Sequence, residues 1–400
     1  MPICGLDVGK REVTACVLSS IPENLKRSAN RAKVVKIEAN QEGIDQLLSM
    51  ADEFAIEPTG DYGRIFVNCI RNAGKTCLIV PAIRVRYYRK HHDCFNKNDR
   101  LDAFFVAAYA LAKRSDPYAF YWPHAETLRE KFLEHMGLTK MCTAKNNRLW
   151  QMLSYRWPEA CVSKGGKRPV QTRDFLDPSP PALWRFIAGE PVFNYPSRSA
   201  SLNSTIGSGL DDLTKAIASQ VCDLEREMYA IELVVIDALM KESEFTPYHA
   251  VFDEFGFGPL VRAAILTRVY PIQRFLGEDS KPIIEYVYSP NSTRSDKLTK
   301  RRVSEAHFKL ALGMGTYRED SGQKRKEKKT GCGYARRALF LHVRTRIMLT
   351  IGASVNSRKE YLQKHARYYA NLDKKIPSTK RVMMACSLIS RDLFKALSQL

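Results

Sequence analysis

Apolar and polar residues follow a regular order over residues 2 to 115 of the chain. Short apolar runs predict three strands at the start, Ile3–Val8, Glu12–Leu18 and Lys33–Ala39. The elements expected after them are a helix at 42–50, a strand at 54–57, a helix at 62–73, a strand at 77–80 and an apolar helix at 99–113. Strands that alternate with helices in this way predict an α/β domain.

Helical patterns dominate the middle of the chain. One runs from Glu126 to about Trp157 and another from Leu210 to Met240, with the proline-rich stretch Pro169 to Pro196 between them. The second pattern carries a heptad-like apolar seam at Leu213, Ile217, Val221, Leu224 and Met228. These two helices predict an arm, and the pattern leaves open whether it is an antiparallel, dimerising coiled coil or an ordinary helical subdomain.

The last third of the chain opens on Phe255-Gly-Phe-Gly-Pro-Leu-Val-Arg262, a turn that leads into an apolar helix at 260–269. Such a turn is similar to a helix-hairpin-helix, whose backbone amides hold a DNA phosphate. A chain of 400 residues exceeds one ordinary core and suggests two or three domains. From the patterns along the chain we expect three, at residues 1–120, 121–245 and 246–400.

Four acidic residues mark the ends of predicted elements in the first domain. Asp7 and Glu57 each close an apolar strand, where open α/β sheets place their chemistry. Asp99 and Asp102 open the apolar helix, and their spacing of three residues puts both on one helix face. Such carboxylates suit two magnesium ions about 4 Å apart, which stabilise the attacking and leaving oxygens of phosphoryl transfer. The alternative for each acid is a helix cap or a solvated end.

The net charge of the chain indicates which class of molecule it binds. The chain has 63 Lys and Arg against 43 Asp and Glu, a formal net charge of +20, which favours a polyanion such as nucleic acid. Its apolar runs are too short for a membrane span, and its first residues lack the pattern of a secretory signal. Ten scattered cysteines indicate reduced thiols and a cytoplasmic protein, and His91-His92-Asp93-Cys94 has no second ligand pair at zinc-finger spacing.

Two basic segments are candidate nucleic-acid surfaces. The first contributes Arg84, Arg86, Tyr87, Arg89 and Lys90. The second contributes Lys324, Arg325, Lys326, Lys328 and Lys329. Ser321 precedes the second segment and is a candidate hydroxyl nucleophile, with Ser304 beside another basic pair as its competitor. Either segment is equally well interpreted as a solvated charged loop.

Three strings together resemble the DEDD transposases of the "one-ten" insertion-sequence family, relatives of the Piv invertases. They are Gly5-Leu-Asp-Val-Gly-Lys10, Glu57-Pro-Thr-Gly-Asp-Tyr62 and Lys97-Asn-Asp-Arg-Leu-Asp-Ala103. The resemblance extends more loosely over the helical arm and the C-terminal Gly-Phe-Gly-Pro and Ser-Gly strings. It implies a RuvC-like domain of ribonuclease H type, a coiled-coil arm and a mainly helical C-terminal transposase domain with a serine nucleophile.

The resemblance also implies a reaction and partners. Asp7, Glu57, Asp99 and Asp102 would hold magnesium (Mg2+), and Ser321 would attack a DNA phosphate to give a covalent phosphoserine. A structured bridge RNA would pair with donor and target DNA, and dimers of the recombinase would pair into tetramers at the nucleoid of a bacterium or archaeon. The lysine-rich run after Ser321 and the string Gly331-Cys-Gly-Tyr-Ala-Arg-Arg337 depart from the family's pattern.

Two other functions stay open from the sequence. One is a metal-dependent Holliday-junction resolvase or nuclease of the same fold, which uses water and needs no serine. The other is a non-catalytic nucleic-acid-binding protein whose acidic residues are structural. Strand joining would separate the recombinase from the nuclease, and strand scission with magnesium would separate both from the binding protein.

Overall fold

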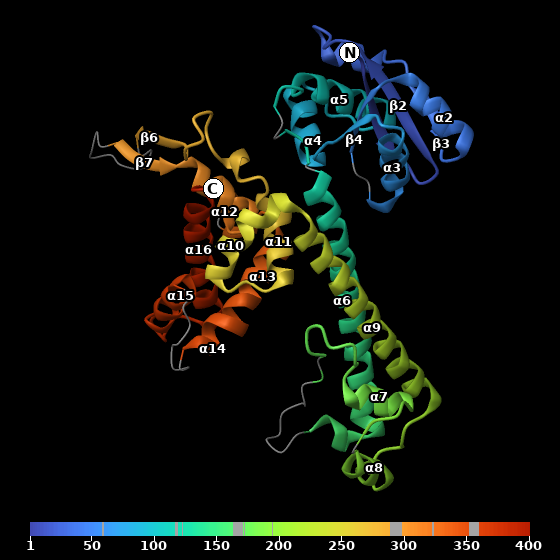
Figure 1. Cartoon of the computed structure of the whole chain (residues 1–400), viewed down its shortest axis with the longest axis vertical. Coiled ribbons are helices and arrows are strands. Elements are labelled where there is room, and N and C mark those ends of the chain that lie inside the picture. The colour runs from blue at the N-terminus through green and yellow to red at the C-terminus, as the bar shows by residue number, and fades with distance from the viewer. Residues whose placement is uncertain are drawn as a thin grey trace. The chain divides into compact units, whose positions relative to one another are not determined.

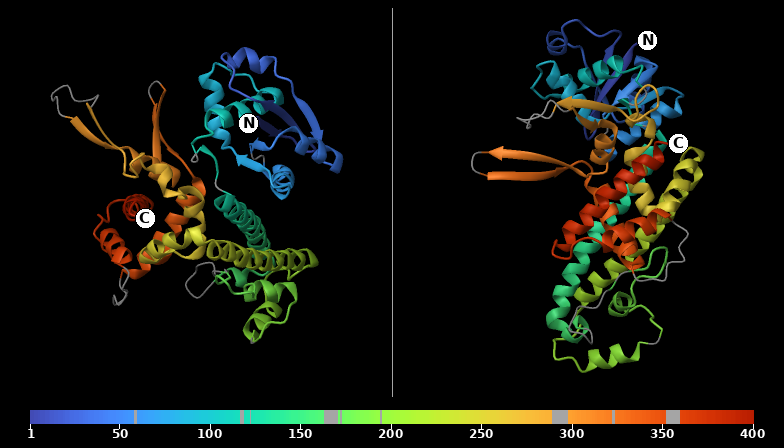
Figure 2. Two further views of the ribbon diagram at one scale, coloured as in Figure 1. Left: turned by 45° about the horizontal axis from the view of Figure 1, so that its top comes forward. Right: turned by 90° about the vertical axis from the view of Figure 1, so that its left-hand side faces the viewer.

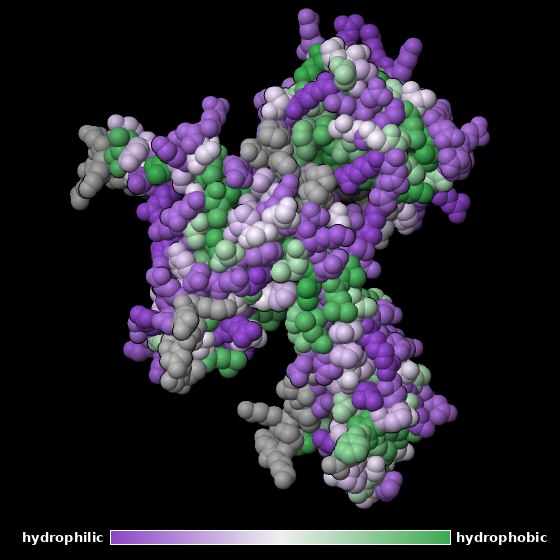
Figure 3. Space-filling model, in the orientation of Figure 1, coloured by the Kyte–Doolittle hydropathy of each residue, from purple (hydrophilic) through white to green (hydrophobic). Residues whose placement is uncertain are grey.

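The computed structural model describes most of the chain. The described residues are 1–57, 60–116, 119–121, 123–162, 171, 173–193, 195–288, 298–321, 324–351 and 360–400. They form two compact units, unit 1 (Met1–Glu126) and unit 2 (Thr127–Leu400), seen in Figures 1 and 2. Most residues on the face drawn in Figure 3 are hydrophilic. The division into three domains stays a prediction.

Unit 1 is built on a five-stranded mixed sheet. Its strands are β1 (Ile3–Val8), β2 (Glu12–Leu18), β3 (Val35–Glu38), β4 (Glu53–Ile56) and β5 (Thr76–Ile79). They lie in the order β3-β2-β1-β4-β5, with β1, β2 and β3 antiparallel and β1, β4 and β5 parallel. The central strands β1 and β4 are buried along nearly their whole length, because apolar cores lie on both sides of the sheet.

The helices of unit 1 confirm the predicted pattern and add two elements to it. They are α1 (Leu25–Asn30), α2 (Gln41–Met50), α3 (Arg64–Asn72), α4 (Ala82–His91) and α5 (Asp99–Ala112). The predicted strands and helices are all present, with ends shifted by at most two residues. The pattern does not predict α1, which is short, or α4, whose buried residues are Val85 and Arg89. An inward face that includes an arginine gives no apolar periodicity.

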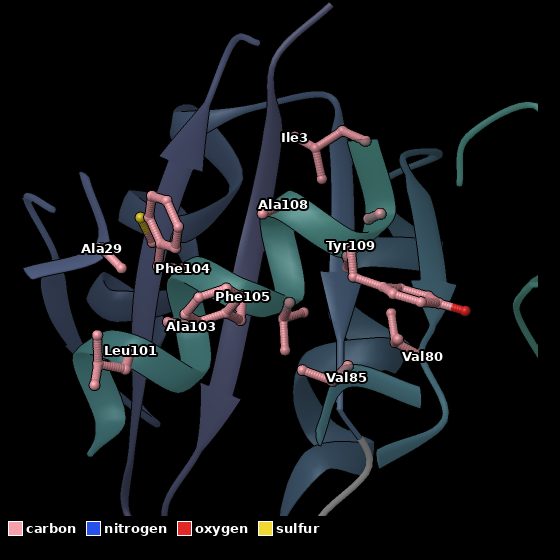
Figure 4. Close-up of a cluster of buried hydrophobic side chains, with 14 of the residues drawn as sticks. Ile3, Ala29, Val80, Val85, Leu101, Ala103, Phe104, Phe105, Ala108 and Tyr109 are labelled. Carbon is pink, nitrogen blue, oxygen red and sulfur yellow. The ribbon is translucent and has the colours of Figure 1, made fainter. Parts of the chain in front are cut away.

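The side chains of β1 alternate between the two cores. Ile3 packs in the core that α5 covers, whereas Cys4 and Leu6 lie in the core on the opposite side. Figure 4 shows the first of these cores, with the side chains of α5 gathered on the strands. By the same alternation, Gly5 and Asp7 point toward the α5 side of the sheet.

Gly5 lets α5 approach β1 to backbone contact. A Cβ at Gly5 would lie 2.3 Å from the carbonyl oxygen of Ala103 and 2.4 Å from the amide nitrogen of Ala107. No side chain fits at such distances, so the helix packs on β1 through one glycine and two alanines that are one helical turn apart. This contact fixes how far the first turn of α5 lies from the end of β1.

Unit 2 contains the two long helices expected from the sequence. They are α6 (Pro123–Arg156), whose first residues belong to unit 1, and α9 (Asp212–Lys241). Lys145 Nζ donates to Gln220 Oε1 at 2.8 Å, and His135 Nε2 lies 3.3 Å from Glu232 Oε1. Residue numbers fall along α6 as they rise along α9, so the pair is antiparallel. A coiled-coil geometry for this pair stays a prediction.

The remainder of unit 2 is mostly helical, as the sequence predicts. Its other helices are α7 (Ala182–Ala188), α8 (Pro196–Asn203), α10 (Thr246–Phe255), α11 (Pro259–Val269), α12 (Val303–Ala311), α13 (Gly333–His342), α14 (Met348–Thr350), α15 (Glu360–Ala370) and α16 (Ser378–Leu397). Two antiparallel hairpins lie among them, β6 (Ile284–Tyr288) with β7 (Leu298–Arg302) and β8 (Gly315–Ser321) with β9 (Lys324–Thr330). Among the helices of the described residues, none has the length and apolar character that a membrane span requires.

Replacing Gly5 by alanine should destabilise the protein strongly, because the added methyl group would overlap the backbone of α5. We expect the free energy of unfolding, measured by urea denaturation, to fall by about 3 kcal/mol. Gly63→Ala is the matched control in unit 1, since its Cβ would meet the side chains of Val8 and Ile56 at 3.7 and 3.8 Å. Those are ordinary contact distances. Equal stability of the two variants would contradict the packing described for Gly5.

Candidate active site

Asp7 and Glu57 meet at the ends of two neighbouring parallel strands. Leu6 of β1 pairs with Ile56 of β4, and the amide of Glu57 donates to the carbonyl oxygen of Leu6 at 3.5 Å. Ala55 packs in the core that α5 covers, so the alternation along β4 directs Glu57 to the same side as Asp7. Both predicted carboxylates therefore lie at one edge of the sheet, on the side of α5.

The other two carboxylates, Asp99 and Asp102, lie at the N-terminus of α5. Asn98 caps this helix, because its Oδ1 accepts a hydrogen bond from the amide of Leu101 at 2.8 Å. Asp99 and Asp102 lie in the first turn, and neither serves as the cap. Asp102 is buried and Asp99 is exposed. The capping alternative therefore does not explain why two acids stand at this helix end.

The four carboxylates, here called the acidic cluster, act on one another through their charges. Burial is the largest cause that raises the pKa of Asp7 to about 6, and the other three carboxylates add to it. Burial also raises the pKa of Glu57 and of Asp102. Lys97 opposes each of these shifts. Like charges held together in a partly buried site repel, and a bound cation would relieve that repulsion.

Asp102 already has a cationic partner. Arg89 of α4 donates to Asp102 Oδ1 from its Nη1, and both side chains are nearly buried. The charge of Arg89 opposes the rise that burial produces in the pKa of Asp102. A buried carboxylate paired with a guanidinium needs no metal ion as counter-charge. A cation bound by Asp102 would therefore compete with Arg89.

The chemistry of the acidic cluster suits a hard divalent cation. Carboxylate oxygens are the ligands that magnesium prefers in proteins. Within the described ranges of the chain, however, no three His, Cys, Asp or Glu side chains come close enough together to hold an ion. The acids would have to draw together around a cation, with Asp102 exchanging Arg89 for it.

An open cavity of about 460 Å³ lies beside the acidic cluster. Thr14, Lys36, Asp99 and Arg100 are among the residues that line it. Thr14 is the cross-strand partner of Asp7, so the cavity adjoins the end of β1 as well as the start of α5. Lys36 on its wall is paired with Glu12, to which its Nζ donates at 2.6 Å, so Arg100 is the basic side chain there that favours an anionic group such as a phosphate.

The first basic segment forms the helix α4. Arg86, Tyr87 and Lys90 are exposed on it and Arg84 is half-buried. Arg89 departs from the expected surface contact with nucleic acid, since it is buried against Asp102. Arg89 follows the buried Val85 by one helical turn, and both side chains therefore face inward.

Ser321 and the second basic segment belong to the β8-β9 hairpin rather than to a loop. Ser321 is the last residue of β8 and pairs with Lys324, the first residue of β9. Lys329 is exposed near the other end of β9. The side chains of Ser321, Lys324, Arg325, Lys326 and Lys328 lie outside the described part of the chain. Their roles in chemistry and binding stay predictions.

Ser304, the other candidate serine, is buried and hydrogen-bonded to the backbone. Ser304 is 1% exposed in the first turn of α12. Its hydroxyl oxygen accepts a hydrogen bond from the amide of Ile283 at 2.8 Å. A buried hydroxyl that satisfies a backbone amide contributes to packing and is not open to a phosphate.

The roles of three residues in this site, Gly5, Lys97 and Arg89, are not predicted in the sequence analysis. Gly5 precedes Asp7 by two residues on the same strand face, and Lys97 precedes Asp99 by two, so both spacings were usable signals. The pairing of Arg89 with Asp102 has no such signal, because it joins two helices whose relative placement only the fold determines.

In EDTA the contribution of Asp7 to the stability of the protein should fall as the pH rises from about 4 to about 6. Folded Asp7 keeps its proton up to about pH 6, whereas an unfolded aspartate loses it near pH 4. Between these values the folded state binds more protons, so raising the pH favours unfolding. Asp7→Asn should remove much of this fall, on the order of 1 kcal/mol after allowance for solvent screening.

Urea denaturation over this pH range measures the effect. Asp52→Asn is the control, because Asp52 is an exposed acid that precedes β4 at the end remote from Glu57. The control should keep the wild-type dependence on pH. An unchanged dependence in Asp7→Asn would contradict the electrostatics described for the acidic cluster.

Comparison with known proteins agrees with this site. No curated protein matches the chain. A family model described as a transposase, of the DEDD type of the IS110 insertion sequences, matches residues 4–158. The matched segment contains the whole acidic cluster and continues through α6. Over residues 4–158 the chain is thus similar to the IS110 transposases, and this match supports an insertion-sequence transposase or recombinase.

Proposed function

We propose that the protein is an RNA-guided DNA recombinase of an insertion sequence, which cuts and rejoins donor and target DNA. One observation carries the proposal: the four acids gather at one edge of the sheet, inside the segment that matches the transposase family. The strand order β3-β2-β1-β4-β5, with α5 packed on β1, agrees with the ribonuclease H-like, RuvC-like fold expected for unit 1.

The acidic cluster is the proposed magnesium site. Asp7, Glu57, Asp99 and Asp102 would hold the ions, which would supply positive charge at the attacking and leaving oxygens of a phosphodiester. A cation of the chain itself would help to place that phosphodiester. Arg100 lines the adjoining cavity, where it would attract the phosphate and orient it toward the acids.

Ser321 is the proposed nucleophile. Its hydroxyl oxygen would bond to phosphorus while the bond from phosphorus to one deoxyribose oxygen breaks. The serine proton passes to a base, and the departing deoxyribose oxygen takes up a proton. A deoxyribose hydroxyl of another strand can then attack the phosphorus of the phosphoserine; its proton passes to a base, the bond from phosphorus to the serine oxygen breaks, and Ser321 takes up a proton as the strands are joined. Ser321 is the last residue of β8 and pairs with Lys324 of the basic strand β9, and a basic neighbourhood of this kind suits a DNA phosphate.

The proposed partners follow from charge. A net charge of +20 suits both a structured bridge RNA and the donor and target DNA with which that RNA pairs. If base pairing selects the sequence, the protein needs mainly contacts to shape and backbone, which dispersed basic residues provide. Dimers that assemble into tetramers would hold donor and target together, at the nucleoid in the cytoplasm.

A nuclease or junction resolvase that uses water is the second candidate. One observation favours it: the acidic cluster lies wholly in unit 1, whereas Ser321 lies in unit 2. Hydrolysis by a metal-bound water would need the first unit alone. Strand joining and a covalent protein-DNA adduct are expected from the recombinase and not from the nuclease.

Asp7→Asn should abolish strand cleavage in magnesium without loss of folding, because it removes one charge of the proposed metal site. We expect the cleavage rate of a labelled donor duplex, measured with guide RNA on a denaturing gel, to fall at least about a hundredfold. Asp52→Asn should cleave at the wild-type rate. Asp102→Asn should lose cleavage and also stability, because it leaves the charge of the buried Arg89 without a counter-charge. Cleavage retained in Asp7→Asn would contradict the metal assignment.

Ser321→Ala should lose a protein-DNA adduct that survives denaturation, and with it recombination. Binding of guide RNA and DNA should persist, since the variant removes a single hydroxyl. Ser304→Ala is the matched control: it should keep the adduct and lose only about 1 kcal/mol of stability with its hydrogen bond to Ile283. Peptide mass analysis of the adduct locates the modified residue. An adduct that persists in Ser321→Ala would move the nucleophile elsewhere.

A further inference from the structure

The β6-β7 hairpin stands out from the helices of unit 2 (Figures 1 and 2). Every residue of its two strands is exposed. Its root is anchored to α12, where the amide of Val303 donates to the carbonyl oxygen of Ile283 at 3.1 Å. A two-stranded ribbon without a packed face is only marginally stable in water. This exposure indicates a surface that meets a partner.

The pairing register sorts the side chains of the hairpin onto two faces. One face carries the cross-strand pairs Tyr286 with Lys300, Ile284 with Arg302, and Tyr288 with Leu298. The opposite face carries Glu285 with Arg301 and Val287 with Thr299. The first set is called the tyrosine face.

The tyrosine face combines large exposed rings with apolar and basic neighbours. The side chains of Tyr286 and Tyr288 are 61% and 67% exposed. Figure 3 shows hydrophobic residues beside strongly hydrophilic ones on this hairpin. Exposed aromatic side chains grouped on one face usually mark a binding surface.

Charge differs between the two faces. On the opposite face, Arg301 Nη1 lies 3.7 Å from Glu285 Oε2, so its charge is balanced within the hairpin. On the tyrosine face, the described residues of the two strands place no acid beside Lys300. Arg302 at the root reaches Glu305 at 3.3 Å. The positive charge nearest the rings is therefore open to an anionic partner.

We propose that the tyrosine face binds an unpaired strand of nucleic acid, with bases stacked on Tyr286 and Tyr288 and a phosphate on Lys300. Two residues along a strand span about 6.8 Å, which is twice the roughly 3.4 Å rise per nucleotide of a stacked strand. One base therefore fits between the two rings. Stacking of this kind accepts any base, while the cation holds the backbone.

This inference rests on the proposed function, because a guided recombinase must hold strands that are not base-paired. A duplex is recognised in its grooves by polar side chains that reach the edges of the bases. The tyrosine face presents aromatic rings instead. Pairing of two copies of the chain through the β7 edge would bring together the like charges of Lys300, Arg301 and Arg302. The chemistry of the tyrosine face thus favours an unpaired strand.

The test measures binding of the full chain to labelled single-stranded RNA, single-stranded DNA of the same sequence and the DNA duplex, by fluorescence anisotropy in EDTA. Tyr286→Ala should bind single strands roughly tenfold more weakly. Tyr286→Phe should bind as the wild type, because the ring is kept. Lys300→Gln should lower the slope of log affinity against log salt by about 0.7. If Tyr286→Ala loses more affinity for single-stranded RNA than for single-stranded DNA, the face binds RNA, and the reverse result identifies DNA.

Val287→Ala is the matched control, on the opposite face of the same strand. It should bind as the wild type. The proposal is overturned by unchanged single-strand binding in Tyr286→Ala, by an equal loss in Val287→Ala, or by a loss confined to the duplex. A change of oligomeric state in Tyr286→Ala with single-strand binding intact would assign the face to a second copy instead.

The choice of EDTA separates this inference from the function on which it rests. No cleavage occurs without a divalent ion, so binding is measured independently of the reaction. Absence of strand joining in magnesium would count against the recombinase alone, whereas the anisotropy results count for or against the tyrosine face.

Discussion

Backbone contact between α5 and β1 is the constraint on which the candidate site depends. Gly5 has no side chain to keep the helix away, and Ala103 and Ala107 have only a methyl group each. The first turn of α5 is therefore held near the end of β1, two residues beyond Gly5. Any larger residue at this contact would move the helix outward, and Asp99 and Asp102 would move with it. The spacing of the acids is thus a property of packing rather than of the acids themselves.

The same arrangement works against the stability of the unit. Burial and repulsion raise the pKa of Asp7, Glu57 and Asp102, which shows that ionised carboxylates are disfavoured there. The apolar cores on both sides of β1 and β4 fix the strand ends from which Asp7 and Glu57 project. Repelling carboxylates that destabilise one place in an otherwise well-packed fold are typical of a functional site. A divalent ion would stabilise such a site more than it would stabilise widely spaced acids on an exposed surface, because it would offset the repulsion between the carboxylates.

Sequence periodicity predicted most of unit 1 because its strands and helices bury continuous apolar faces. It also placed Asp7 and Asp99 at the ends of their elements, since strand and helix ends are local features. It did not predict α4, where Arg89 replaces an apolar residue on the inward face. Nor did it predict that Ser321 ends a strand, because the hairpin that contains it is rich in charge and poor in apolar residues. Pairings between distant elements, such as Arg89 with Asp102, require the fold.

One helix connects the surface of unit 1 to its acidic cluster. Arg86 and Lys90 are exposed on α4, while Arg89 of the same ten-residue helix is paired with Asp102. A polyanion that shifts α4 would shift the guanidinium from the carboxylate, and an ion that captures Asp102 would release α4. Thermodynamic linkage makes such an effect reciprocal. If the acidic cluster is the metal site proposed above, its affinity for the metal would rise when nucleic acid holds α4 away from Asp102, and cutting would then wait for the substrate.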